Sequence, residues 1–274
     1  MLKLKYFLEK NKMLIMIIAI ILVCSIAIAF GVYSQITNKG ARFTDNEEIE
    51  NNYEELKSNF QDIFTNEINK EATAKININY DEILYCKYNV EEENNGKYNI
   101  YAKVPNFKGN TETINKINTE IFDIFAKQIV KIINEASVYT TYNLDYVAYV
   151  NNNIVSLVIR CKYKDGTNPQ RTIIKTYNYD IENDRLLNME DIIDYKNLNK
   201  GDMQNKVQEE IKKVNSQIKN ISEQGYNVYL RDENSEIYKI DNTPDFFLGK
   251  NNYLYLVYAY GNNNHTSEMD LVIF

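Results

Sequence analysis

Histidine and cysteine are the side chains that most often do chemistry, and both are scarce in this sequence. It contains one His and three Cys among 274 residues. The single histidine, His265, lies in an Asn-rich stretch with no second His and no nearby Cys. Metal sites and Ser/His or Cys/His nucleophile pairs need a histidine beside other reactive groups. We therefore interpret His265 as an exposed loop residue and predict no metal site.

Pairs of acidic side chains are the next candidates for chemistry. Asp180 with Glu182, and Glu190 with Asp191, are close enough in sequence to suggest a general acid and base or calcium ligands. No EF-hand spacing surrounds them, and solvated turn charges and helix caps explain them more simply. A carboxylate-dependent peptidoglycan hydrolase stays open as an alternative. It would need two carboxylates facing each other across a cleft, at about 5–10 Å.

Sequence motifs for common catalytic and cofactor sites are absent. The chain has no glycine-rich phosphate loop, no G-x-S-x-G and no H-E-x-x-H. We therefore predict that the protein is not an enzyme and binds no cofactor.

Cys86 and Cys161 both fall in segments with the alternating pattern of strands. In an oxidising exterior they could form a disulfide that closes a long loop. The other interpretation is two small apolar residues buried in the core. A bridge requires the two Cβ atoms to lie about 3.5–4.5 Å apart.

Tyrosine is abundant, with 23 residues. Strand periodicity predicts that Tyr253 and Tyr255 lie on one face of a strand, and that Tyr258 and Tyr260 lie on the other. An exposed row of these rings would suit binding of a protein or a glycan. Half-buried sheet faces, with each ring packed and its hydroxyl hydrated, are the alternative.

An apolar segment near the N-terminus indicates where these residues are presented. Residues 13–33 carry no charge, and a helix of this length spans roughly 30 Å of hydrocarbon. We predict a transmembrane helix over residues 13–36, preceded by a cytoplasmic tip over 1–12. A cleavable signal peptide ending near Ala27–Ala29 is an alternative. Lipidation of Cys24 is a further one, although Cys24 more simply reads as an apolar helix residue.

The distribution of charge supports this topology. The net charge is −7, but residues 1–12 contain four Lys and one Glu, which gives +3 and leaves −10 for the rest. Basic residues before a membrane helix place the N-terminus in the cytoplasm. We expect a single-pass protein of the cell membrane with its main domain outside. Acidity of that domain disfavours nucleic acid as a partner.

Hydrophobic periodicity predicts an α+β fold after the membrane segment, with antiparallel sheets packed with single helices in two associated halves. Residues 37–73 form a juxtamembrane linker and an amphipathic helix from Asn46 to Glu71, which either packs on its own domain or forms a short stalk. The two halves cover residues 74–165 and 166–274. The predicted elements are a hairpin over 76–102 ended by Pro105, a helix over 110–136, a meander over 138–181, a connector over 186–194, a helix from 201, and strands at 226–230, 237–240, 253–260 and 268–273.

Four stretches carry a resemblance to a known group of domains. They are YNIYAKVPNFKGNTETINKINTEI at 98–121, NNNIVSLVIRCKYKDG at 151–166, TYNYDIENDRLLNMEDIID at 176–194 and NNYLYLVYAYGNNNHTSEMDLVIF at the end. Together they resemble the tandem extracytoplasmic domains of RsiV-type anti-sigma factors and PdaC-type peptidoglycan deacetylases, over residues 75–274. The resemblance implies an α+β fold in a bacterial cell envelope and, for the RsiV branch, recognition of lysozyme.

The chain departs from this group in three places. A Gly-Gly-Ala-His-Gly-like turn is replaced by Asp165–Gln170, so this turn has no histidine. Twelve N-terminal residues are short for holding a sigma factor, and no metal-binding deacetylase domain follows the resemblance. We therefore expect a membrane-anchored, non-catalytic domain that recognises a protein or cell-wall glycan. A lysozyme-binding sensor is the alternative within the same group.

Overall fold

The computed structural model describes residues 45–71, 73–74, 82–225, 228–260 and 268–274. The chain divides into two compact units, residues 1–58 and 59–274. In the first unit the described element is helix α3 (Asp45–Ser58). No helix in the described ranges is long and apolar enough to cross a membrane. The predicted transmembrane residues 13–36 lie outside these ranges.

The amphipathic helix predicted from Asn46 to Glu71 is too long. Helix α3 ends at Ser58, and a 3-10 turn (Asn59–Asp62) and strand β1 (Ile68–Lys70) follow it. Asn66 has a φ of 60°, which interrupts helical backbone, and the nearby β1 pairs with strand β4 (Thr140–Asn151). Phe60, which the pattern placed on the helix, is instead 1% exposed in the core of the second unit.

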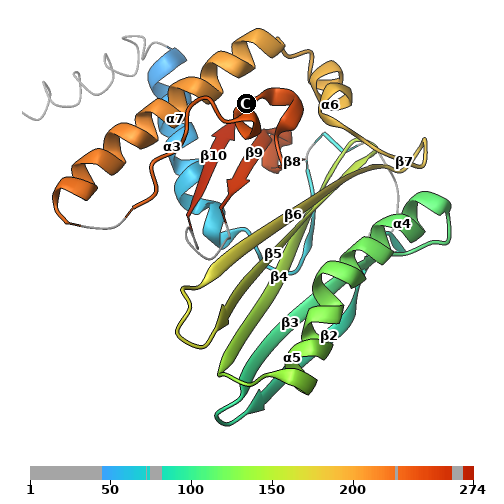
Figure 1. The fold of residues 1–274 in the computed structure, drawn as a ribbon. Helices are drawn as coiled ribbons and strands as arrows, with labels where there is room; N and C mark the ends of the chain where they lie inside the picture. The colour runs from blue at the N-terminus through green and yellow to red at the C-terminus, as the bar shows by residue number, and fades with distance from the viewer. Residues whose placement is uncertain (1–44, 72, 75–81, 226–227, 261–267) are drawn as a thin grey trace, which may run out of the picture. The chain divides into compact units, whose positions relative to one another are not determined.

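The second unit is built on a seven-stranded sheet and a three-stranded sheet (Figure 1). The large sheet has the order β2-β3-β4-β5-β6-β7, with β1 beside β4, and the small one has the order β10-β9-β8. The strands are β2 (Leu84–Asn94), β3 (Tyr98–Phe107), β4 (Thr140–Asn151), β5 (Ile154–Asp165), β6 (Arg171–Asp180), β7 (Arg185–Leu186), β8 (Asp245–Leu248), β9 (Leu254–Ala259) and β10 (Met269–Ile273).

The large sheet is mixed, whereas the pattern had predicted antiparallel sheets. β2 with β3, β4 with β5, and β5 with β6 are antiparallel as expected. β3 pairs with β4 in parallel, because a helical crossover returns the chain to the same end of the sheet. β1 also runs parallel to β4, beyond the point where β3 stops pairing.

Strand β3 continues through Pro105, where the sequence had suggested that it stops. Pro105 pairs with Cys86 of β2. Pairing of β3 with β4 covers only Tyr98–Ala102, so the other side of β3 is an edge at Pro105. A proline without an N–H is tolerated at such an edge.

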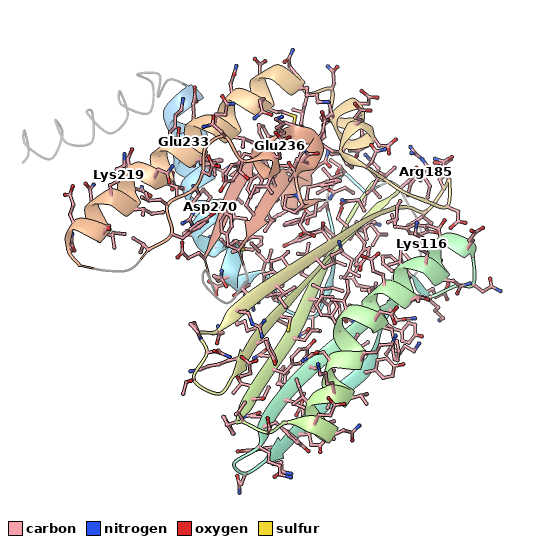
Figure 2. All side chains as sticks on the ribbon, in the orientation of Figure 1. Lys116, Arg185, Lys219, Glu233, Glu236 and Asp270 are labelled. Carbon is pink, nitrogen blue, oxygen red and sulfur yellow. The ribbon has the colours of Figure 1, made fainter. Side chains whose placement is uncertain are left out.

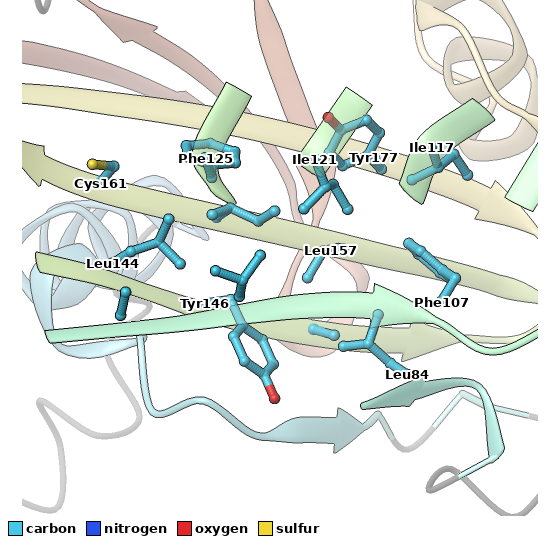
Figure 3. Close-up of a cluster of buried hydrophobic side chains, with 14 of the residues drawn as sticks. Leu84, Phe107, Ile117, Ile121, Phe125, Leu144, Tyr146, Leu157, Cys161 and Tyr177 are labelled. Atoms are coloured by element: carbon cyan, nitrogen blue, oxygen red, sulfur yellow. The ribbon is translucent and has the colours of Figure 1, made fainter. Parts of the chain in front are cut away.

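The helical crossover covers one face of the large sheet (Figures 1 and 3). It consists of α4 (Glu112–Ile121), a π-helical turn (Phe122–Ala126) and α5 (Lys127–Glu135). The Thr111 hydroxyl caps α4 by accepting from Ile114 N at 3.2 Å. The isoleucines on one face of these helices and every second residue of the facing strands form a hydrophobic core, which we call the first core. Central members are Ile117, Ile121, Phe125, Leu144 and Leu157, all 1% exposed or less.

The C-terminal part corrects three more predictions. Residues 186–194 are not a simple connector, because helix α6 (Met189–Lys196) begins there with a capping box between Asn188 and Asp191. Residues 228–230 and 237–240 form no strand; the second segment lies in 3-10 turns. Strand β8 was not predicted. Helix α7 (Lys200–Glu223) is confirmed and packs with the small sheet in a second core.

The small sheet lies on the face of the large sheet opposite to α4 and α5. Alternate residues of β5 show this: Leu157 belongs to the first core, while its neighbour Ser156 accepts from Leu248 N of β8 at 3.2 Å. The predicted boundary at 165/166 falls in the turn of the β5–β6 hairpin. Residues 59–274 are therefore described as one unit with two cores.

Candidate functional site

The four tyrosines expected as a binding surface alternate as predicted but do not form an exposed row. Tyr255, Tyr258 and Tyr260 are 4%, 1% and 9% exposed, and Tyr253 is half-buried. Tyr255 stacks on Phe247 with ring centroids 4.6 Å apart. Both faces of β9 are covered, one by the large sheet and the other by the second core, so these rings have a packing role.

Cys86 and Cys161 are both free thiols, so the structure contains no disulfide between them. Cys161 is 1% exposed in the first core, as expected for a small apolar residue, and burial raises its pKa to about 12. Cys86 is exposed on β2. It lies at an irregularity in the strand that is described below.

The acidic pairs act as caps and turn residues. Asp180 accepts from the backbone N–H groups of Glu182 and Asn183 at 3.1 and 3.2 Å. Asp191 caps α6 and pairs with Arg185 at 2.7 Å, which holds the pKa of Asp191 below its ordinary value. Both arrangements give these carboxylates structural partners.

Two buried arginines have structural partners. Arg231 contacts Glu268 and Asp270, the latter at 2.8 Å, beneath the ring of Tyr260. Asp270 lies on β10 (Figure 2). Arg160 binds both carboxylate oxygens of Asp145. The guanidinium groups of both arginines donate to partners inside the fold, so few of their N–H groups are left for a ligand.

A groove beside β2 and α4 is the most suitable place for a ligand. Its volume is about 500 Å³. Eight residues from β2, β3, the following loop and the helical crossover line it: Lys87, Tyr88, Asn106, Gly109, Asn115, Asn118, Thr119 and Phe122. Helix α4 can be followed in Figure 2 from the labelled Lys116. We call this set the β2–α4 groove.

Two backbone irregularities shape this groove. The register of β2 against β3 shifts between Cys86 and Tyr88, which is a β-bulge at Lys87. The π-helical turn begins at Phe122. Both irregularities occur preferentially at functional sites. Here they bring the rings of Tyr88 and Phe122 to a centroid distance of 6.2 Å, tilted by 49°.

Polar side chains complete the groove. The Asn118 amide accepts from Phe107 N and donates to Phe107 O, both at 2.8 Å, so it fixes α4 to the end of β3. The amides of Asn106 and Asn115 donate to Phe107 O and Asn110 O. Their carbonyl oxygens accept no hydrogen bond from the residues that the structure describes, and they remain as acceptors for a ligand.

The chemistry of the groove suits binding. Its lining, as far as the described residues form it, contains no carboxylate, cysteine or histidine, so these residues supply no acid, base or nucleophile of these types. Two rings, amide acceptors and one ammonium are groups that hold a polar ligand with apolar faces. In the sequence, the hairpin pattern over 76–102 and the isoleucines of α4 predicted the two elements. Neither pattern indicated the bulge or the π-helical turn.

Comparisons with known proteins give structural similarity alone. No family model matches the sequence, and no curated protein matches it. Among solved structures, a DUF3298 family protein from Pseudomonas aeruginosa is 11% identical, with a TM-score of 0.36, over 64% of this chain and 79% of that chain. A DUF3298 family member from Bacteroides fragilis is 13% identical, with a TM-score of 0.32, over 64% and 81%. Neither description names a ligand or partner.

Proposed function

We propose that this chain is a membrane-anchored, extracytoplasmic, non-catalytic binding protein of the bacterial cell envelope, and that the β2–α4 groove binds cell-wall glycan. The observation that carries the proposal is the pair of rings, Tyr88 and Phe122, placed 6.2 Å apart in a groove with amide acceptors. The apolar segment at residues 13–33 and its basic flank support the membrane location.

Glycans have the complementary chemistry. A sugar ring presents apolar C–H faces that pack on aromatic rings and hydroxyl groups that donate to carbonyl oxygens. The groove offers both types of contact, and its volume of about 500 Å³ falls in the range of small-molecule sites. A groove for an apolar peptide would be lined mainly by apolar side chains, whereas three asparagines line this one.

A cationic protein such as lysozyme is a second candidate partner. Glu91, Glu92 and Glu93 are exposed near the end of β2, and an acidic surface steers a basic partner toward it. This surface belongs to the same hairpin as the groove but does not line it. Replacing Glu91 and Glu93 with Lys separates the two candidates.

A carboxylate-dependent hydrolase is a third candidate, because one carboxyl group of the chain has a raised pKa. Burial between β6 and β8 raises the pKa of Asp245 to about 7. Its carboxylate accepts from Thr176 N at 3.0 Å, and it does not line the β2–α4 groove. Release of soluble glycan by the purified chain, lost in Asp245→Asn, would favour this class over simple binding.

Sedimentation with insoluble peptidoglycan tests the main proposal. Full-length chain in detergent micelles is mixed with purified cell walls, and the pelleted fraction is measured. We expect Phe122→Ala to lower this fraction and Phe122→Tyr to preserve it. Tyr139→Ala is the matched control, because Tyr139 is 44% exposed and lies outside the groove.

Equal pelleting of Phe122→Ala and the parent chain, with both folded by circular dichroism, would contradict glycan binding at this groove. Pull-down with lysozyme, with and without the Glu91 and Glu93 replacements, tests the second candidate. Protease treatment of intact and lysed cells tests the location: digestion of residues 59–274 only after lysis would contradict an extracytoplasmic domain.

A further inference from the structure

We infer that the β2–α4 groove selects glycans that carry negative charge, as carboxylate or phosphate, and that Lys87 is the residue that distinguishes them from neutral glycans. The inference rests on the proposed function and specifies its ligand. Its basis is the position and the pairing of charges around the groove.

The charge of the groove differs in sign from that of the protein. The chain has a net charge of −7, yet among the residues that the structure describes Lys87 is the one charged residue that lines the groove. Charges outside the lining act on a ligand through water and salt, which screen them over about 8–10 Å. A ligand in the groove therefore contacts a positive charge although the protein as a whole is acidic.

Lys87 is also free to bind an anion. It is exposed at the β-bulge, and its ammonium lies 5.4 Å from the centroid of the Tyr88 ring. It forms no ion pair with the residues that the structure describes. The bulge therefore presents the ammonium next to a ring on which a sugar would pack.

A second lysine close to the ring pair provides a comparison. Lys127 lies over the Phe122 ring at 5.8 Å, but its ammonium pairs with Asp123 at 2.6 Å. The charge of Lys127 is thus compensated one helical turn away, while that of Lys87 is not. Of the two ammonium groups near the aromatic pair, only Lys87 offers an uncompensated charge to a ligand.

The expected effect follows from the exposure of Lys87. Ion pairs between exposed groups contribute about 0.2–1 kcal/mol and weaken with salt. This range corresponds to roughly 1.5- to 5-fold in affinity. Lys87→Gln should therefore reduce affinity for a charged glycan about 1.5- to 5-fold, and it should leave affinity for a neutral glycan unchanged.

Calorimetric titration of the full-length chain in detergent micelles tests this. The probes are three oligosaccharides of equal length: a neutral N-acetylglucosamine oligomer, the same oligomer with a carboxylate on alternate sugars, and one with phosphate groups instead. The two charged probes distinguish the sources of negative charge. Lys87→Gln and Lys87→Arg are compared with Lys127→Gln, whose charge is already paired.

We expect a charged probe to bind more tightly than the neutral one. This difference should disappear in Lys87→Gln, persist in Lys87→Arg and Lys127→Gln, and become smaller when salt is added. Equal affinity for neutral and charged probes would overturn the inference while leaving glycan binding in place. Absence of binding to all three probes would remove the proposed function as well, so the two failures are distinguishable.

Discussion

Ser156 and Asn178 lie opposite each other on β5 and β6, and the Ser156 hydroxyl donates to the Asn178 carbonyl oxygen at 2.7 Å. The same two side chains bind the backbone of β8: Leu248 N donates to Ser156 Oγ, and the Asn178 amide donates to Phe246 O. Two further side chains bind the same strand: the Thr176 hydroxyl accepts from Phe246 N, and the Asn151 amide donates to Leu248 O. Side chains of the large sheet thus bind the backbone N–H and C=O groups at the free edge of β8, which another strand would ordinarily pair with.

Ser156→Ala should destabilise the second unit. It removes the acceptor of Leu248 N and the donor to Asn178 in a site where Ser156 is fully buried. Leaving buried polar groups without partners costs about 1–3 kcal/mol. Urea unfolding measures the loss, and Ser137→Ala, at an exposed serine, is the control. Equal midpoints for the two variants would contradict the role of this side chain.

Asp145→Asn should be far more damaging than Asp123→Asn. Asp145 binds Arg160 through both carboxylate oxygens, and Arg160 has only 7% side-chain exposure. Breaking a buried pair leaves an uncompensated charge and costs about 3–5 kcal/mol. The exposed pair of Asp123 with Lys127 contributes less than about 1 kcal/mol. Thermal unfolding of both variants measures the contrast, and similar losses would show that the buried pair is not needed.

Titration of Asp245 should lower the stability of the folded chain as pH rises from about 4 to 7. Burial raises its pKa to about 7; Glu120 adds to the shift and Lys175 opposes it. An unfolded Asp titrates near pH 4. Between these values the folded chain holds a proton that the unfolded chain has released, so a rise in pH favours unfolding.

Asp245→Asn should flatten this slope, because its amide oxygen can still accept from Thr176 N. Urea midpoints at pH 5 and pH 8, compared between the parent chain and the variant, provide the measurement. Asp241→Asn is a control at an exposed acid. Parallel slopes for the parent and Asp245→Asn would contradict the raised pKa.

Maleimide labelling should modify Cys86 in the native chain and spare Cys161. Cys86 is exposed, while Cys161 is buried with its pKa raised to about 12, so little reactive thiolate is available there. Mass spectrometry of the two peptides gives the labelled fractions, with labelling in urea as the reference. Labelling of neither cysteine until a reductant is added would indicate the disulfide that the structure lacks.

The sequence predicted the elements whose side chains follow one period over many residues. The isoleucines from Ile114 to Ile132 predicted a helix, and alternation over 138–181 predicted the meander. The sequence did not predict β8, which has only four residues and whose edge is satisfied by side chains 68–97 positions away in sequence. A local pattern contains no information about such distant partners.

The groove was beyond prediction for a related reason. A β-bulge and a π-helical turn each add one residue to a regular element, and neither Lys87 nor Phe122 interrupts the apolar pattern around it. The four tyrosines from Tyr253 to Tyr260 show a similar limit. Their alternation was clear and left a packed and an exposed arrangement open, because coverage of both faces depends on the large sheet and on α7. Helix α6 was missed in a segment predicted as a connector, although its capping by Asn188 and Asp191 is a local signal.

Strand β1 has a mechanical consequence. It is the first strand of the second unit, it has three residues, and it pairs with the central strand β4. Any tension carried along the backbone from the predicted membrane anchor reaches the sheet through Phe60 and β1 before it reaches any other strand. Because so few hydrogen bonds hold β1, it would detach at a smaller force than the twelve-residue β4–β5 pair. Pulling on the N-terminus would therefore uncover one edge of β4 while the rest of the sheet stays folded.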